Sequence, residues 1–298
     1  MTEFNVSAHL QEVLASFSLC NDARFKAIMS AVVRHLHACI TEVKLRPDEW
    51  KDAIEFLTET GHACTEKRQE FILLSDLLGL STLTIGINQQ RGDDCLEETV
   101  EGPYYWEGAA ELPSGADISE GVKGFKTYYY GRVIDGSGAP IANALLDVWS
   151  GDGEGNYDMQ LPGQQEMMAR GKFRTNTLGE YGFWSIKPSY YPIPSDGPAG
   201  HMQRKLGRHP NRPGHIHFKL SADGYVPVNT QLFIANGPYL ESDCVFGVKP
   251  GLIVDYVEHP AGVAPDGREM SKPFSSVPFD FRLTAIQHSN ARTSYEDR

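Results

Sequence analysis

Residues 213–220 read Pro213-Gly214-His215-Ile216-His217-Phe218-Lys219-Leu220. Alternating polar and apolar positions after a proline predict a strand that begins after a turn and buries one face. Side chains alternate along a strand, so we expect Ile216 and Phe218 to enter a core layer while His215 and His217 share the opposite face. Two imidazoles on one face suit a metal ion, but such a pair is equally often a polar surface pair. The pair alone leaves both interpretations open.

The chain beyond residue 120 has the same short, extended character. Alternating or apolar segments are separated by glycine-rich turns such as Asp135-Gly136-Ser137-Gly138. Many short strands with regular turns are typical of a β-sandwich or barrel. The predicted strands are 125–134, 144–149, 181–186, 214–220, 228–235 and 279–283. We therefore predict a mainly β protein, with a β-sandwich domain over residues 121–298.

Residues 1–120 are predicted to form a helical amino-terminal domain. Apolar residues recur at helical spacing within 10–17, 25–36 and 50–57. Pro47 and Gly61 suit the two ends of one helix. Residues 71–80 are almost all apolar, which predicts a single helix buried on most sides. Asp76 interrupts this run, and it either lies on a solvated edge or faces a ligand pocket.

Composition excludes several classes of partner and location. Asp and Glu number 39 against 27 Lys and Arg, so the net charge is −12. Such a chain repels a phosphate backbone, and we expect no nucleic-acid partner. Five scattered cysteines without a Cys-x-x-Cys pattern match neither a disulfide framework nor a zinc ribbon. No apolar run of about 18 residues and no signal-like start occur, which favours a cytoplasmic protein without a membrane span.

The loop Gly151-Asp152-Gly153-Glu154-Gly155-Asn156-Tyr157 has the glycine spacing of a phosphate or calcium loop. No helical pattern follows its third glycine, as a dinucleotide loop requires. Counted from Asp152, the sixth and twelfth positions are Tyr157 and Gly163, where a calcium loop needs glycine and glutamate. We interpret the segment as a loop after a strand, and Tyr157 as its residue of interest.

Metal chemistry favours tyrosine as the companion of the two histidines. Zinc or ferrous iron with two histidines normally takes a carboxylate, and none is evident in the strand pair that carries His215 and His217. A phenolate is a hard anionic donor, but ionising tyrosine at neutral pH costs about 4 kcal/mol, given a free pKa of about 10. A strongly Lewis-acidic ion offsets that cost, which points to ferric iron.

Four segments together resemble the intradiol ring-cleaving dioxygenases over about residues 70–256. They are the Asn156-Tyr157 loop, Tyr191 before Pro192-Ile193-Pro194-Ser195-Asp196-Gly197-Pro198, the stretch Leu206-Gly207-Arg208-His209 to Arg212-Pro213-x-His215-Ile216-His217, and Gln231. The resemblance implies one Fe(3+) per subunit, held by Tyr157, Tyr191, His215 and His217 and completed by hydroxide. It places the ligand on Tyr191, so that the neighbouring Tyr190 faces the core.

The same resemblance implies an activity. A 1,2-diol on an aromatic ring binds the iron through both oxygens and displaces Tyr191, and O2 then opens the ring to a cis,cis-muconate-type diacid. Arg212 is expected to stabilise developing negative charge, or else forms a salt bridge that holds its turn. Gln231 is expected to hydrogen-bond in the same region, or else is an ordinary strand amide.

Around Asp76 and Tyr191 the chain is more similar to hydroxyquinol 1,2-dioxygenases than to the catechol branch. That branch implies that Asp76 meets the third hydroxyl of 1,2,4-trihydroxybenzene, giving 3-hydroxy-cis,cis-muconate or maleylacetate. The implied pocket consists of Leu73, Asp76, Val100, Gly102, Pro103, Tyr104, Pro192 and Ile193. Glu101 before Gly102-Pro103 looks more like the catechol enzymes, so catechol 1,2-dioxygenase stays the alternative.

The helical domain over 1–120 has a family counterpart that forms a homodimer interface, contributes to the pocket and can hold a phospholipid. The expected partners are thus a small aromatic diol, O2 and a second copy of the chain. Two functions from other classes remain open. One is a cupin-like zinc or ferrous enzyme that uses His215, His217 and a carboxylate. The other is a non-catalytic β-sandwich binding module with a helical arm.

Overall fold

The computed structural model describes residues 4–65, 68–89, 95–161, 163–164 and 166–286. Backbone contacts divide the chain into two compact units, residues 1–59 and 60–298, rather than near residue 120. The reason is that the helices α4 (Glu70–Leu77) and α5 (Leu80–Asn88) and the segment after them make their contacts within the second unit. Thr82 Oγ1 donates to the Val245 carbonyl over 3.0 Å, and Leu112 N donates to the Lys172 carbonyl over 2.8 Å.

The first unit is helical, as its apolar spacing predicts. It contains α1 (Val6–Ala15), the short η1 (Ser16–Leu19), α2 (Ala23–Val43) and most of α3 (Pro47–His62). Asp22 caps α2 by accepting from Phe25 N over 2.8 Å, and Pro47 begins α3. One set of exposed apolar residues on α2 recurs every three or four positions and therefore shares a face: Phe25, Ile28, Val32, Leu36, Ile40 and Val43.

The prediction of a single buried helix over residues 71–80 is wrong. Gly79 adopts a left-handed φ of 72°, which ends α4 and redirects the chain into α5 at an angle of 74°. α4 buries Leu73, Leu74 and Leu77, but Phe71 and Ile72 are exposed and α5 contains no fully buried residue. Within the described residues no single helix is long and apolar enough to cross a membrane; the bent pair α4 and α5 reaches that length and composition only together.

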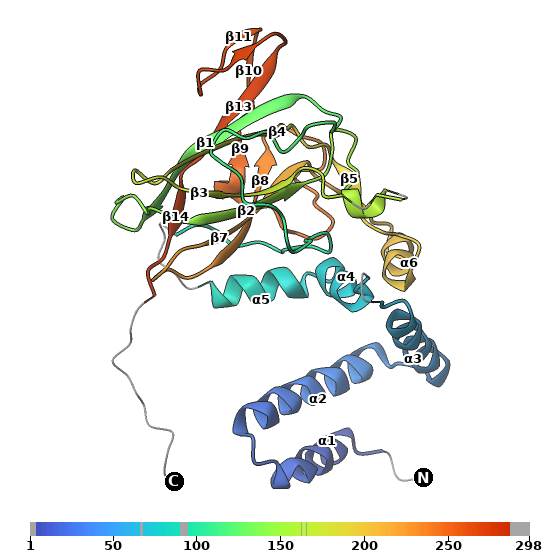
Figure 1. Ribbon diagram of the computed structural model, residues 1–298. Coiled ribbons are helices and arrows are strands. Elements are labelled where there is room, and N and C mark those ends of the chain that lie inside the picture. Colours follow the sequence, from blue (N-terminus) through green and yellow to red (C-terminus); the bar gives the residue numbers. More distant parts are fainter. Residues whose placement is uncertain (1–3, 66–67, 90–94, 162, 165, 287–298) are drawn as a thin grey trace. The chain divides into compact units, whose positions relative to one another are not determined.

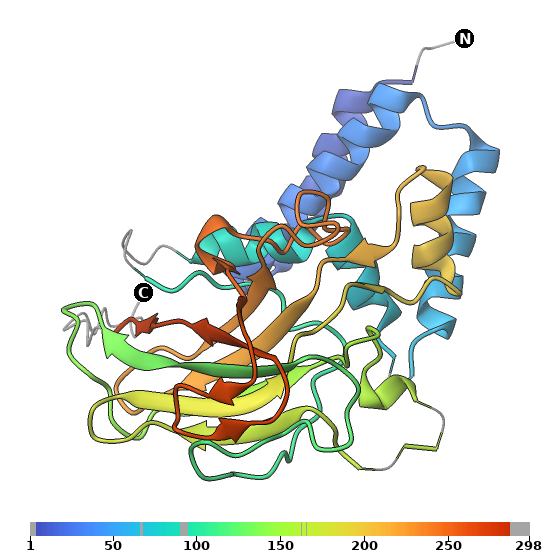
Figure 2. The same ribbon diagram turned by 90° about the horizontal axis from the view of Figure 1, so that it is seen from above.

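Two five-stranded sheets carry the second unit (Figures 1 and 2). One has the order β10 (Val257–His259), β13 (Phe274–Pro278), β1 (Lys126–Asp135), β14 (Phe281–Leu283), with β4 (Glu180–Ile186) also paired to β1. The other has the order β3 (Arg170–Arg174), β2 (Leu145–Ser150), β7 (His215–Ser221), β8 (Val228–Ile234), β9 (Ile253–Val254). The smaller elements are η2 (Asp158–Gln160), β5 (Tyr191–Pro192), α6 (Pro198–Lys205), β6 (Asn211–Arg212), η3 (Pro250–Leu252), β11 (Gly262–Val263) and β12 (Glu269–Met270).

The main hydrophobic core lies between these two sheets, which confirms the predicted β-sandwich. Phe183 of β4 stacks on Phe173 of β3 at 4.7 Å, and Phe218 of β7 meets Phe281 of β14 at 4.8 Å between ring centroids. All six predicted strands are present, with their ends displaced by no more than two residues. The inner face of the β7 sheet is thus filled by aromatic packing, and its outer face is left for other residues.

Candidate metal centre

β7 presents both histidines on the outer face of its sheet. Ile216 and Phe218 are fully buried in the core between the sheets, whereas His215 and His217 point the other way, as the alternation predicts. His217 pairs with Trp149 of β2 on one side and with Gln231 of β8 on the other. Directly paired residues share a face, and the Trp149 indole stacks on the His217 ring at 4.6 Å and 12°.

Two buried tyrosines reach the histidines from separate loops. Tyr157 ends the loop after β2, and Tyr191 begins the two-residue strand β5. Tyr157 Oη lies 2.9 Å from His217 Nε2, and the two histidine Nε2 atoms lie 3.1 Å apart. The Tyr191 ring is 5.2 Å from that of Tyr157 and 5.6 Å from that of His215. The structure therefore brings together all four predicted donors, which lie far apart in sequence.

Their spacing fits a shared metal ion. Two donors about 2.1 Å from one metal and roughly at right angles lie about 3.0 Å from each other, close to the 2.9 and 3.1 Å observed. Among the described residues, no group of three His, Cys, Asp or Glu lies close enough to hold a metal. The donor set available on this face is therefore two imidazoles and two phenols, without the carboxylate that a zinc or ferrous site normally uses.

Both imidazoles are neutral, and the tautomer of His215 is defined by its surroundings. His215 Nδ1 lies 2.7 Å from the Pro213 carbonyl, which must accept its hydrogen and so leaves Nε2 unprotonated. Complete burial, reinforced by the Arg212 charge, lowers the pKa of His215 to about 3. Burial, with His215 and Arg212 nearby, also places the pKa of His217 well below its ordinary range. Both rings are therefore neutral near pH 7.

The two phenols differ in how easily they ionise. Burial raises the pKa of Tyr157 well above its ordinary value, and the neighbouring Tyr191 adds to this rise. Burial also raises the pKa of Tyr191, but the Arg212 charge and hydrogen bonds from Tyr157 and Arg212 oppose it. Without a cation both remain protonated at neutral pH. A strongly Lewis-acidic metal would be needed to hold both as phenolates.

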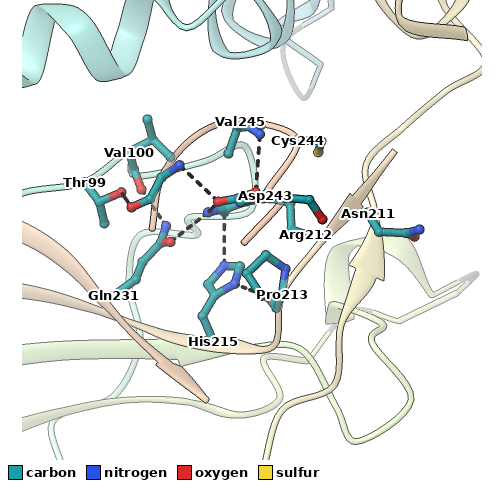
Figure 3. A network of polar contacts seen from close by, with 12 residues as sticks. Thr99, Val100, Asn211, Arg212, Pro213, His215, Gln231, Asp243, Cys244 and Val245 are labelled. Carbon is teal, nitrogen blue, oxygen red and sulfur yellow. Dashed lines mark hydrogen bonds and ion pairs between the residues drawn. The ribbon is translucent and has the colours of Figure 1, made fainter. Parts of the chain in front are cut away.

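A network of buried polar groups surrounds Arg212, three residues before His215 (Figure 3). Its Nη1 lies 3.1 Å from His215 Nε2, and its Nη2 donates to Gln231 Oε1 over 2.9 Å. Gln231 Nε2 in turn donates to the Val100 carbonyl over 2.7 Å and lies 3.2 Å from His217 Nδ1. The predicted pair Arg212 and Gln231 thus lies beside both histidines.

The predicted pocket residues fall into three groups. Gly102 and Tyr104 lie at the donors, because a Cβ on Gly102 would be 3.7 Å from His217 Cε1 and Tyr104 stacks on Tyr157 at 4.5 Å. Leu73, Asp76, Val100 and Ile193 are buried. Pro103 and Pro192 are exposed, and their part in a pocket stays a prediction.

The expectation that Tyr190 faces the core is wrong. It is 43% exposed and packs on Tyr239 at 5.1 Å, because adjacent residues of an extended chain point to opposite sides and Tyr191 takes the buried one.

Several residues that support the site were not identified from the sequence. Asp158, next to Tyr157, forms a fully buried ion pair with Arg170 of β3. Gln160 accepts from Tyr157 N and donates to Tyr104 Oη, both over 2.9 Å. Asp243 pairs with Arg212 across 31 residues of sequence. Gln160 contacts Tyr157 locally, three residues away, whereas the two ion pairs join segments that only the folded chain brings together and that no local pattern marks.

Comparison with known proteins shows which families the chain is similar to. The chain matches the family model described as Dioxygenase over residues 100–285 and the model described as Catechol dioxygenase N terminus over residues 22–95. It is 44% identical to the 6-chlorohydroxyquinol 1,2-dioxygenase of Cupriavidus pinatubonensis, over 88% of this chain and 95% of that one. It is 42% identical to the hydroxyquinol 1,2-dioxygenase of Nocardioides simplex, over 92% and 94%.

Solved structures of 1,2-dioxygenases are also similar to this chain. The hydroxyquinol 1,2-dioxygenase of Pseudomonas putida superposes with a TM-score of 0.88 at 40% identity, covering 94% of this chain and 98% of that one. The catechol 1,2-dioxygenase of an Acinetobacter species superposes with a TM-score of 0.81 at 29% identity, covering 96% and 94%.

The neutral burial of His215 predicts a pH dependence of stability. Its pKa is about 3 in the folded protein and about 6.5 when unfolded, so between these values the unfolded chain binds the extra proton. The metal-free protein should therefore lose stability as pH falls, by about 3 kcal/mol for this group between pH 6.5 and 4. Urea titrations of metal-free protein and of His215→Gln should show a shallower pH dependence in the variant. Parallel curves would contradict the neutral, buried state of His215.

Proposed function

The chain belongs to the intradiol ring-cleaving dioxygenases, and we propose that it cleaves hydroxyquinol (1,2,4-trihydroxybenzene) with O2 between the two adjacent hydroxylated carbons. The observation that carries this proposal is the convergence of Tyr157, Tyr191, His215 and His217 on one buried point. Relatives at 42–44% identity that are named hydroxyquinol 1,2-dioxygenases favour this substrate. The product would be 3-hydroxy-cis,cis-muconate or its tautomer maleylacetate.

Members of this family use non-heme iron, and the donor chemistry favours the ferric state. We propose that the four donors hold one Fe(3+) per subunit. Bound there, the ion would draw electron density from the ring of a bound diol and so make the ring reactive toward O2. The chain keeps both imidazoles neutral by burial, so the two phenolates would supply the negative charge that a trivalent cation requires.

Tyr191 is suited to act as a base when the diol binds. It lies on a strand of only two residues, and Arg212 stabilises its ionised form more directly than that of Tyr157. Tyr157 is held on both sides, by Gln160 at its backbone and by the Asp158 and Arg170 pair next to it. We propose that Tyr191 leaves and accepts a diol proton while Tyr157 stays in place.

Arg212 and Gln231 are proposed to stabilise negative charge on the reacting ring. A guanidinium stays ionised at any working pH, and Arg212 lies beside His215 in a buried site. Donors fixed in such a place stabilise developing charge far more than they would in water. Gln231 binds Arg212 Nη2 and so helps to hold the guanidinium at this position.

Asp76 is the residue proposed to select hydroxyquinol over catechol. It is a buried carboxyl group in an otherwise apolar helix, and it is close enough to Arg212 for the guanidinium charge to affect its pKa. Burial raises the pKa of Asp76, against a hydrogen bond from Ser81 and the charge of Arg212. Leu73 is buried one turn earlier on α4. A third ring hydroxyl would give the Asp76 carboxyl group a partner that catechol lacks.

We further propose that the protein is cytoplasmic, that it forms a homodimer through the first unit, and that the helices of this unit bind a phospholipid. The exposed stripe from Phe25 to Val43 on α2 supports an apolar contact of this kind. Leu36→Glu should convert the dimer to monomer in sedimentation equilibrium. Unchanged mass in that variant, or a monomeric unsubstituted protein, would contradict the proposed interface.

Oxygen uptake by the iron-loaded protein tests both the reaction and the role of Asp76. Hydroxyquinol should consume one O2 per ring and should be turned over with a higher kcat/KM than catechol. Asp76→Ala should lower kcat/KM for hydroxyquinol by about 10- to 100-fold, the equivalent of about 1.5–3 kcal/mol for a hydrogen bond to a charged group, and should affect catechol much less.

A control for this test is Asp280→Asn, which removes the carboxylate of an exposed ion pair with Arg132. This variant should keep both activities. Equal losses on the two diols in Asp76→Ala would rule out a selective role for Asp76. No oxygen uptake with either diol would rule out the proposed function itself.

A further inference from the structure

Asp243 and Arg212 form a buried, two-pronged ion pair next to the metal centre (Figure 3). Arg212 Nε donates to Asp243 Oδ1 and Arg212 Nη2 donates to Oδ2, both over 3.1 Å. The two side chains are only 3% and 2% exposed. These two parallel hydrogen bonds fix the plane of the guanidinium, and the carboxylate neutralises its charge.

The pair leaves one end of Arg212 directed at the metal centre. Nε and Nη2 are occupied by Asp243, and Nη2 also donates to Gln231 Oε1 over 2.9 Å. The remaining nitrogen, Nη1, faces His215 Nε2 at 3.1 Å. We infer that Asp243 is a positioning residue, which holds Arg212 so that Nη1 faces the diol and the charge that develops on it. This inference rests on the proposed function.

Asp243 is itself held by a tight turn. Its carboxylate accepts from Val245 N over 3.3 Å and from Gly247 N over 3.0 Å. A Cβ on Gly247 would come within 2.9 Å of Arg212 Nη2 and 3.0 Å of Thr99 Oγ1, so glycine allows this close approach. Backbone donors of the turn thus orient the carboxylate in addition to Arg212.

The turn closes a ring of contacts around the guanidinium. Thr99 Oγ1 donates to the Gly247 carbonyl over 2.8 Å, and the next residue, Val100, accepts from Gln231 Nε2 over 2.7 Å. The ring closes because Gln231 Oε1 accepts from Arg212 Nη2. Residues 99–100, β8 and the turn 243–247 thus converge on one side chain. Among the residues that the structure describes, Asp243 is the only one whose carboxylate hydrogen-bonds to it.

Charge explains why a carboxylate is needed there. A buried guanidinium without a counter-ion pays a large desolvation cost and would turn toward another anion. Tyr191 would be such an anion once a bound metal ion had ionised it, because the Arg212 charge favours its phenolate form. Asp243 neutralises Arg212 from the far side, so that Tyr191 can leave without taking the guanidinium with it.

A double-mutant cycle on the iron-loaded protein tests the inference. Asp243→Asn and Arg212→Met should each lower kcat for hydroxyquinol by about 100-fold, the effect typical of losing one aimed donor, with KM changing far less. Because Asp243 acts through Arg212, the double variant should be no slower than Arg212→Met alone. Multiplying losses would overturn the inference, as would an Asp243→Asn protein with unchanged kcat. Asp280→Asn is the control substitution and should leave kcat unchanged.

Two readouts separate positioning from a structural or metal-binding role. Asp243→Asn should bind iron with the same stoichiometry and visible absorption as the unsubstituted protein; loss of iron would overturn the inference. In urea unfolding of the metal-free protein, each single variant should be less stable than the double variant, because each leaves one buried partner unpaired. Additive losses would show that the two side chains are not coupled. An unsubstituted protein that consumes no O2 would instead refute the proposed function and leave this unfolding cycle interpretable.

Discussion

Side-chain alternation along β7 constrains both the core and the candidate metal centre. Ile216 and Phe218 fill the space between the two sheets, and His215 and His217 must then point outward. A shift of one residue in the pairing with β2 or β8 would turn the imidazoles into the core between the sheets and Phe218 onto the outer face. The packing of the sandwich therefore fixes the direction of the two histidines more firmly than any loop does.

The outer face of this sheet is then made into a site by loops. The phenols of Tyr157 and Tyr191 arrive from two connections, and α4 carries the buried Asp76, whose pKa the charge of Arg212 affects. Loops are less rigid than strands, and here buried ion pairs hold them. The ion pair of Asp158 and Arg170 holds the loop that carries Tyr157. The ion pair of Asp243 and Arg212 holds the side of the site that carries Arg212. The two phenols differ accordingly, since Arg212 favours ionisation of Tyr191 more directly.

Periodicity alone predicted the sandwich strands, the helices of the first unit and the orientation of His215 and His217. These features depend on short-range alternation, which a sequence records directly. The break at Gly79 was missed because the apolar pattern continues through it, and the sign of φ at a glycine depends on tertiary packing. Family resemblance supplied Tyr157, Tyr191, Arg212 and Gln231, which spacing did not connect. Neither periodicity nor family resemblance identified Asp243 and Arg170, because an ion pair between separate segments of the chain leaves no local pattern.

The central claim is that Tyr157 and Tyr191 bind the same ferric ion as the two histidines. Resonance Raman spectroscopy of the iron-loaded protein, excited in its visible absorption band, tests this most directly, because it enhances the ring vibrations of metal-bound tyrosinates only. We predict tyrosinate bands that weaken in Tyr157→Phe and in Tyr191→Phe, with a shifted absorption in each. An iron-loaded protein without visible absorption, or a spectrum that neither substitution changes, would contradict the account.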